Sequence, residues 1–147
     1  MAKQTIDAPG PKRLVLFISN HNSARSQMAE ALLRAKYGNR YDVHSAGVEL
    51  EPLNPLAVKV MQEIGLDISH RKPKSVDGFI RPELALDTVV TLCDTAARIC
   101  PFLPAPRNVT KIYEDPARFG GTEEEQLNRL REMRDDMARW IESFFKY

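Results

Sequence analysis

Two hydrophobic patterns alternate along this chain, namely short apolar segments and apolar residues at helical spacing. Continuous apolar runs at residues 14–18 and 86–92 are typical of buried strands, and the segments 41–45 and 109–113 also fit short strands. Apolar residues at helical spacing predict helices over residues 24–37, 55–64 and about 123–146. Because strands alternate with helices, we expect a single α/β domain, with a four-stranded parallel sheet and helices on both of its faces.

Residues at the ends of these segments supply the expected helix boundaries. Asn54 followed by Pro55 is a typical helix start, and Thr122 has the spacing to Glu125 of a capping box. Residues 76–84 predict a short helix that is interrupted near Pro82. The residues expected to face the core from the last two long helices are Leu56, Val60, Met61, Ile64, Leu127, Leu130, Met133, Met137, Ile141 and Phe144.

Composition and charge limit the function classes. The chain has 147 residues and a formal net charge of +1, which fits one domain and gives no electrostatic footprint for nucleic acid. We expect that domain to span residues 13–147, after a flexible lead of residues 1–12. No apolar run approaches the roughly 20 residues of a membrane span, and the lead lacks the apolar core of a secretory signal. We therefore expect a cytoplasmic protein without a membrane partner, and we expect it to be a monomer.

The segment 19–25, between the first strand and the first helix, is the strongest candidate for chemistry. Its residues are small or polar, and a strand that turns through such residues into a helix directs several backbone N–H groups at one point. The positive end of the helix dipole lies at the same point, so the natural ligand is an oxyanion. Arg25 can bind two oxygens of a tetrahedral anion at once. The alternative is an ordinary polar turn.

Three reactive side chains follow closely on predicted strands. Ser19 follows the strand at 14–18, Cys93 follows the strand at 86–92, and Asp115 lies just after the strand at 109–113. In a parallel sheet, ligands bind beyond the carboxyl ends of the strands. We therefore expect all three side chains at one edge of the sheet.

The turn resembles the C-x5-R loop, followed by serine, of low-molecular-weight protein tyrosine phosphatases and of the thioredoxin-coupled arsenate reductases that share their fold. The sequence His-Asn-Ser-Ala-Arg-Ser-Gln-Met-Ala-Glu at 21–30 is closer to the reductases. So is the cysteine pair, with Val-Thr-Leu-Cys-Asp at 90–94 and Cys-Pro at 100–101. Between the cysteines, residues 94–99 are expected to form one or two helical turns. Two buried cysteines that act only as small apolar residues are the alternative interpretation of the pair.

The resemblance implies a thiol mechanism. In that scheme Arg25 and the loop bind arsenate or a phosphate-like oxyanion, position 19 is the nucleophile, and Asp115 supplies a proton or shields the site. Cys93 then attacks position 19, and Cys100 attacks Cys93, which leaves a Cys93–Cys100 disulfide that thioredoxin or a similar dithiol reduces. No cofactor is implied. The expected substrate-binding residues are Asn20, His21, Asn22, Ser23, Ala24, Arg25 and Ser26.

One position departs from the resemblance, because Ser19 stands where the family has its nucleophilic cysteine. A serine hydroxyl offers no thiolate, and no general base lies beside it in the sequence. Either the cysteine of a working reductase has been replaced, which we favour because every other expected part is present, or the chain is a natural paralogue that binds oxyanions without turnover. A phosphatase is a further alternative, which needs position 19 and Asp115 but neither Cys93 nor Cys100.

Other residues of the turn have expected supporting roles. Ser26 can donate a hydrogen bond to the group at position 19, which would stabilise a thiolate there. Asn22 is expected to brace the loop, and His21 to face either the anion or solvent.

A metal is not expected. Some members of the family bind a monovalent cation through residues that are matched here by Asn22, Glu30 and Ser45. The remaining positions are Lys72 and Lys74, which repel a cation, and an ammonium group in its place is the expected substitute.

Overall fold

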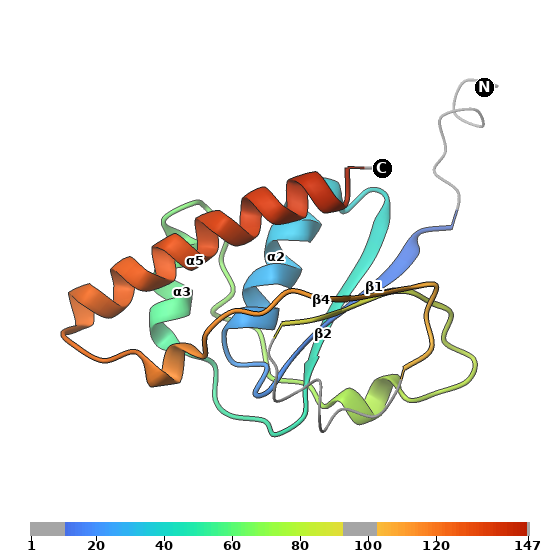
Figure 1. Ribbon diagram of the computed structural model, residues 1–147, viewed down its shortest axis with the longest axis horizontal. Helices are drawn as coiled ribbons and strands as arrows, with labels where there is room; N and C mark the ends of the chain where they lie inside the picture. The colour runs from blue at the N-terminus through green and yellow to red at the C-terminus, as the bar shows by residue number, and fades with distance from the viewer. Residues whose placement is uncertain (1–10, 93–102, 147) are drawn as a thin grey trace.

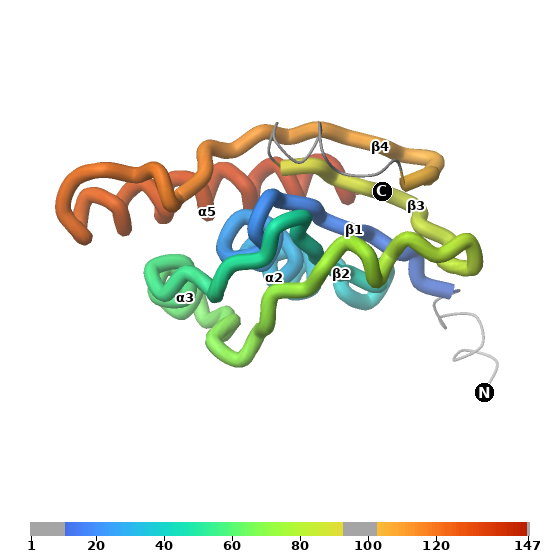
Figure 2. The backbone as a smooth tube through the Cα atoms, turned by 90° about the horizontal axis from the view of Figure 1, so that it is seen from below, coloured from blue at the N-terminus to red at the C-terminus, as the bar shows by residue number. Residues whose placement is uncertain are grey.

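The computed structural model describes residues 11–92 and 103–146 and has an α/β architecture. Its four strands are all parallel and lie in the order β2-β1-β3-β4 (Figures 1 and 2). This confirms the predicted four-stranded parallel sheet. The elements, in chain order, are β1 (Arg13–Ser19), α2 (Arg25–Tyr37), β2 (Tyr41–Gly47), α3 (Pro55–Gln62), the 3-10 helix η1 (Val76–Phe79), β3 (Leu86–Thr91), β4 (Arg107–Thr110), the 3-10 helix η2 (Pro116–Arg118) and α5 (Glu123–Phe144).

The sheet separates two hydrophobic clusters. Alternate residues of β1 point to opposite faces, so that Val15 and Phe17 belong to one cluster while Leu16 and Ile18 belong to the other. The helices α2, α3 and α5 pack on the first face and lie on one side of the sheet in Figure 1. In the described part of the chain, η1 and Leu103 pack on the second face. The helical turns predicted at 94–99 lie outside the described residues. None of the described helices is long and apolar enough to cross a membrane.

The strand register brings the carboxyl ends of the strands to one edge. Ser19 at the end of β1 pairs with Gly47 at the end of β2, and Ile18 pairs with Thr91 at the end of β3. The chain remains hydrogen-bonded beyond β4, because the backbone N–H of Tyr113 donates to a carbonyl just after β3 at 2.9 Å. The segments that follow β1, β3 and β4 therefore all start from the same edge.

Two predicted elements differ from the structure. Instead of a helix over 76–84, only the 3-10 turn η1 forms, and it ends at Phe79. Pro82 cannot donate a backbone hydrogen bond and disfavours a helical conformation in the residue before it. The last strand is Arg107–Thr110 rather than 109–113, and Ile112 is 59% exposed. Because β4 lies at the sheet edge and alternates between half-buried and exposed residues, hydrophobicity alone did not mark its limits.

The helix boundaries largely follow the predicted caps. Asn54 caps α3 through its side chain, and Thr122 forms the predicted capping box at the start of α5. However, α3 ends two residues before Ile64, which is 43% exposed rather than part of the apolar face. At the end of α5, Phe145 is the fully buried residue, while the predicted Phe144 is only partly buried.

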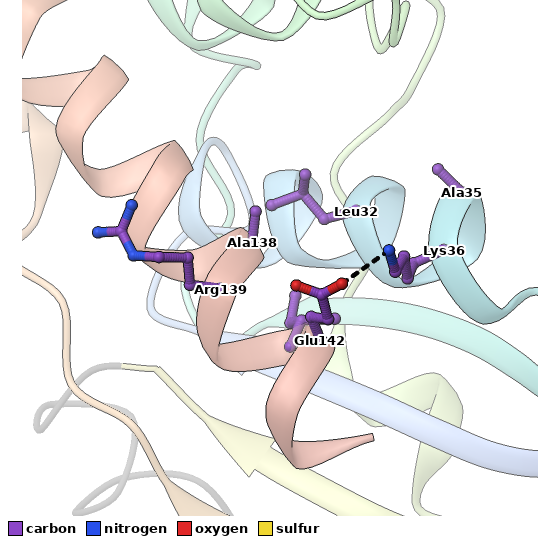
Figure 3. Close-up of a pocket in the computed structure, with 7 residues that line it drawn as sticks. Leu32, Ala35, Lys36, Ala138, Arg139 and Glu142 are labelled. Carbon is purple, nitrogen blue, oxygen red and sulfur yellow. Dashed lines mark ion pairs between the residues drawn. The ribbon is translucent and has the colours of Figure 1, made fainter. Parts of the chain in front are cut away.

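A groove between α2 and α5 lies toward the carboxyl end of α2, whereas the candidate anion-binding turn precedes its amino end. The side chains of Lys36 and Glu142 point toward one another across this groove, with a distance of 2.9 Å from Nζ to Oε2 (Figure 3). Both side chains are at least half exposed, so this ion pair contributes little to stability. The groove therefore lies between two packed helices, away from the candidate site.

A denser ionic contact joins α3 to α5. The guanidinium group of Arg131 donates to both carboxylate oxygens of Glu63, and Arg134 donates to Oε1 at 2.9 Å. Arg134 also donates to the carbonyl of Val60 at 2.8 Å. The hydrogen bonds from Arg131 and then Arg134 lower the pKa of the Glu63 carboxyl to about 2.

We predict that Glu63→Gln lowers the free energy of unfolding at neutral pH and that this effect disappears in acid. The pKa of Glu63 is about 2 in the folded chain, against an ordinary value of 4.5. Its contribution is therefore complete above the ordinary value and is lost as the pH falls toward 2. Urea unfolding of both proteins across this pH range measures the difference. As a control for the loss of one charge, Glu83→Gln removes the carboxylate of an exposed pair with Arg81. A pH-independent difference for Glu63→Gln would contradict the account.

Candidate active site

The turn after β1 is fastened to the following segment through its carbonyl groups. The carbonyl of Asn20 accepts hydrogen bonds from the N–H groups of Val48 and Glu49, both at 2.8 Å. The carbonyl of Ser23 accepts from the N–H of Asn54 at 2.8 Å. These carbonyls are bonded to residues 48–54, so they do not compete for the N–H groups of the turn. Successive N–H groups in such a turn form an anion-binding concavity.

The amino end of α2 is buried and lacks a side-chain cap. Ala24 occupies the cap position, and no side chain among the described residues bonds to the first N–H groups of the helix. Ala24, Arg25 and Ser26 are each less than 5% exposed. The helices α3 and α5, by contrast, are capped by side chains. Buried N–H groups at a helix start need a partner, and an oxyanion also matches the helix dipole.

The hydroxyl of Ser19 lies among hydrogen-bond donors. Its Oγ is 2.6 Å from the Oγ of Ser26 and accepts from the backbone N–H of Asn22 at 3.2 Å. The Oγ of Ser26 in turn accepts from Asn22 Nδ2 at 2.7 Å, so the single hydroxyl hydrogen of Ser26 is free to point at position 19. Two donated hydrogen bonds at one atom favour a negative charge on that atom. The structure thus places Ser26 within hydrogen-bond distance of position 19, and its role in stabilising a thiolate there stays a prediction.

The side chain of Asn22 makes all four hydrogen bonds that an amide can make. Its Nδ2 donates to Ser26 and to Ser45, and its Oδ1 accepts from Gln27 Nε2 at 3.0 Å and from the backbone N–H of Lys74 at 2.8 Å. A backbone N–H can only donate, which fixes the orientation of the amide. Asn22 is fully buried and has a left-handed backbone, with φ of 52°, which asparagine tolerates better than most residues. Asn22 therefore braces the turn, as predicted.

The hydrogen-bond network continues from Ser45 to a buried carboxylate. The hydroxyl of Ser45 donates to Glu30, which is 1% exposed. Arg34 pairs with Glu30 at 2.6 Å, Arg71 also donates to it, and Lys74 Nζ lies 3.6 Å away. Three cationic side chains thus surround this carboxylate, as a buried charge requires.

The cationic surroundings of Glu30 correct part of the sequence interpretation. Lys74 contacts Glu30, whereas Lys72 takes part through its backbone carbonyl, which accepts a hydrogen bond from Gln27. Sequence reasoning missed Arg34 and Arg71. The spacing of four between Glu30 and Arg34 on one helix could have indicated the first pair. Nothing local in the sequence indicated Arg71.

Arg25 and Asp115 face each other at the mouth of the turn. Arg25 NH1 donates to the carbonyl of Tyr113 at 3.2 Å, and its NH2 lies 3.7 Å from Asp115 Oδ1. Asp115 caps η2 by accepting from the N–H of Ala117 at 3.0 Å. His21 Nε2 lies 3.7 Å from Asp115 Oδ2. The structure therefore brings Asp115 to the turn, and His21 faces this carboxylate instead of solvent.

Tyr113 has a second fixed contact besides its bond to Arg25. Its hydroxyl donates to Asp136 of α5 at 2.8 Å. Burial, followed by this hydrogen bond, raises the pKa of the Tyr113 phenol. The phenol remains a donor at neutral pH, so α5 holds the residue whose carbonyl orients Arg25.

Gly47 is a site residue that sequence reasoning did not identify. A Cβ atom at this position would lie 2.8 Å from the backbone N of Asn22 and 2.8 Å from the backbone C of His21. Only glycine allows β2 to approach the turn this closely. The backbone of Gly47 also donates to the carbonyl of Lys74 at 2.8 Å, which ties the turn to residues 72–75.

Ser19, Arg25 and Asp115 therefore meet at one edge, together with the loop residues between positions 19 and 26. Cys93 and Cys100 lie outside the described residues. The described residue that precedes Cys93 in the sequence is Leu92, whose N–H donates to the carbonyl of Ile18 at 2.8 Å. Among the described residues there is no group of three or more His, Cys, Asp or Glu side chains that could hold a metal ion.

This geometry agrees with a known family. Residues 14–138 match the family described as low molecular weight phosphotyrosine protein phosphatase. The chain belongs to this family. The range that matches the phosphatase family includes the turn at 19–25, both cysteines and Asp115.

Several members of the phosphatase fold that resemble this chain are named arsenate reductase. An arsenate reductase from Halalkalibacterium halodurans is 40% identical over 134 residues, which cover 90% of this chain and 95% of the relative. A solved arsenate reductase in its reduced state has a TM-score of 0.69 at 26% identity, covering 89% of this chain and 95% of that chain. A thioredoxin-dependent arsenate reductase from Corynebacterium glutamicum has a TM-score of 0.61 at 28% identity, covering 96% of this chain and 66% of that chain.

We predict that Gly47→Ala destabilises the fold and weakens oxyanion binding together. The added methyl group meets backbone atoms of the turn, which must move, and overpacking of this kind costs about 1–3 kcal/mol. Urea unfolding gives the stability, and calorimetric titration with phosphate gives the affinity. Gly120→Ala is the matched control, because a Cβ there meets nothing within 4 Å. Unchanged phosphate affinity in a folded Gly47→Ala protein would contradict this role.

Proposed function

We propose that this chain is an arsenate reductase whose nucleophilic position is occupied by serine, so that in its present form it binds an oxyanion without reducing it. The observation that carries this proposal is the buried, uncapped amino end of α2 beside Arg25. Such an end is a binding site for a tetrahedral oxyanion. Arsenate and phosphate share this shape and charge, so both are proposed ligands.

Residues of the turn divide into binding and reacting groups in this proposal. The loop from Asn20 to Ser26 and the Arg25 guanidinium hold the oxyanion. Position 19 is the attacking atom, where a thiolate would accept hydrogen bonds from Ser26 and from the N–H of Asn22. Asp115, at the mouth of the turn, is the proton donor.

The proposed reaction requires a thiolate at position 19. The thiolate attacks arsenic, an As–S bond forms, and an As–O bond breaks as the leaving oxygen takes a proton from Asp115 and departs as water. A Cys93 thiolate then attacks the sulfur at position 19, the S–As bond breaks, and its electron pair stays on arsenic, which leaves as arsenite. Cys100 attacks Cys93 and frees position 19. The resulting Cys93–Cys100 disulfide is reduced by a dithiol protein such as thioredoxin.

Two features favour a reductase over a phosphatase. Cys93 and Cys100 serve the proposed reductase, whereas a phosphatase of this fold needs only position 19 and Asp115. The relative from H. halodurans, at 40% identity, is named arsenate reductase, and the C. glutamicum relative is described as thioredoxin-dependent. A mechanism that depends on free thiols suits a reducing compartment, so we propose that the chain acts in the cytoplasm. We also propose that it is a monomer.

Ser19 is best explained as a replacement of the nucleophile. Serine differs from cysteine by one atom, and the surrounding donors Ser26 and Asn22 are those that a thiolate needs. No described residue beside Ser19 offers a general base, because its hydroxyl contacts are a second hydroxyl and a backbone N–H. A natural oxyanion-binding paralogue is the second candidate, and the unaltered hydrogen-bond donors around Ser19 are compatible with it.

We predict that Ser19→Cys creates arsenate turnover, while the chain as it stands has none. The exchange changes one atom in an intact set of donors, so stability should change by no more than about 1 kcal/mol. NADPH consumption with thioredoxin, thioredoxin reductase and arsenate measures turnover in both forms. Adding Cys100→Ser to Ser19→Cys should abolish this turnover but leave hydrolysis of an aryl phosphate within about twofold, because hydrolysis needs no second thiol.

The outcomes of this experiment separate the candidates. Arsenate turnover by the serine form would show that the nucleophile lies elsewhere. Aryl phosphate hydrolysis without arsenate turnover in Ser19→Cys would identify a phosphatase. No activity of Ser19→Cys toward either substrate, with phosphate still bound, would identify a binding protein.

A further inference from the structure

We propose that His21 is a positioning residue that holds a proton for Asp115, so that the two side chains act as a proton-sharing pair at the mouth of the turn. This inference rests on the proposed function, because it assigns a role in the step that Asp115 serves. It concerns a side chain for which the sequence left the orientation open.

The contact of His21 Nδ1 shows that this nitrogen is protonated. His21 Nδ1 lies 2.7 Å from the backbone carbonyl of Glu49, and a carbonyl oxygen can only accept a hydrogen bond. Nδ1 must therefore carry hydrogen, and it donates to Glu49. This contact fixes both the ring orientation and the tautomer.

The second nitrogen faces the carboxyl group. With hydrogen on Nδ1, a neutral imidazole presents a lone pair at Nε2, 3.7 Å from Asp115 Oδ2. A lone pair and a carboxylate oxygen repel each other, so the arrangement is satisfied only when one proton resides on either Nε2 or Oδ2. The separation is that of an ion pair and is longer than a hydrogen bond, and such contacts tighten when substrate binds.

The charged groups around the pair come from three segments. Glu51 Oε2 lies 3.6 Å from His21 Nδ1, and Arg25 NH2 lies 3.7 Å from the other oxygen of Asp115. Oδ1 of Asp115 also accepts from the N–H of Ala117, which leaves Oδ2 as the oxygen that faces His21. The side chains of His21 and Asp115 are 14% and 20% exposed, so solvent can exchange protons with the pair.

The pair would act when the As–O bond breaks. Before this step the shared proton resides on His21 Nε2. It passes to Asp115 Oδ2, and Asp115 gives it to the leaving oxygen, which departs as water. Asp115 is again a carboxylate, and solvent restores the proton on Nε2. No electron changes hands in this exchange, and arsenic keeps its oxidation state until the second thiol attacks.

Two substitutions separate this role from that of a structural anchor. The side-chain N–H group of asparagine takes roughly the place of Nδ1, so His21→Asn keeps the bond to Glu49 but has no group facing Asp115. Glutamine reaches roughly the place of Nε2, so His21→Gln can donate to Asp115 but has no proton to exchange. An anchor would tolerate His21→Asn, whereas a proton-sharing residue would not.

The activity test is made in the Ser19→Cys protein. We expect His21→Asn and His21→Gln each to lower kcat for arsenate about tenfold, with KM within about twofold and with the alkaline limb of the pH–rate profile moved to lower pH. His44→Asn is the matched control, because His44 pairs with Asp42 at 3.0 Å on an exposed part of β2. A His21→Asn protein with an unchanged kcat and pH profile would overturn the proposal.

A second test uses the chain with Ser19 and needs no turnover. Ring ¹⁵N shifts should show His21 protonated at Nδ1 throughout the pH range, and Asp115→Asn should move the Nε2 signal of His21 while leaving that of His44 in place. An Nε2-protonated neutral tautomer, or no response to Asp115→Asn, would overturn the proposal. Because this measurement is independent of reduction, it remains decisive even if Ser19→Cys is inactive and the proposed function fails.

Discussion

The buried amide of Asn22 is the interaction on which the candidate site depends. Its two donors reach Ser26 and Ser45, and its carbonyl oxygen accepts from Gln27 and from the backbone of Lys74. One side chain therefore joins the turn to the start of α2, to β2 and to residues 72–75. A buried polar group with every bond made is stable, whereas one lost partner leaves a costly unsatisfied atom. The left-handed backbone of Asn22 is maintained by these contacts.

Binding an oxyanion and reacting with it depend on different groups of the candidate site. In the proposed function, backbone N–H groups, the start of α2 and Arg25 hold the ligand, and none of these groups depends on the atom at position 19. The proposed turnover, in contrast, requires a thiolate at position 19, and the hydroxyl of Ser19 lies where donors would stabilise one. Removing a thiolate also removes a negative charge beside the ligand, which favours an anion. We therefore expect binding and turnover to be separable in this protein.

Local patterns predicted much of this structure, because the features concerned are written in adjacent residues. The apolar run of β1, the Asn54 cap and the capping box at Thr122 all lie within a few positions. The turn was equally visible, since small polar residues between a strand and a helix have a local physical meaning. The predicted limits of β4 were wrong, because an edge strand with half-exposed residues has a weak hydrophobic pattern.

Contacts between distant segments could not be predicted in this way. Arg71 pairs with Glu30 across 41 positions, and the approach of Gly47 to the turn depends on strand register. The orientation of His21 follows from a carbonyl of Glu49 and a carboxyl group that arrives after β4. Each of these depends on tertiary packing, which a single sequence does not encode in its spacing.

The most direct test of the account is a titration of the unaltered chain with phosphate and arsenate. The readout is the set of backbone ¹⁵N–¹H signals of residues 19–26, recorded at each ligand concentration. If the turn holds oxyanions without a thiolate, the N–H signals of this segment will shift and saturate at millimolar concentrations, and Arg25→Lys will weaken the affinity because lysine cannot bind two oxygens at once. Signals that do not move at tens of millimolar would contradict the central claim.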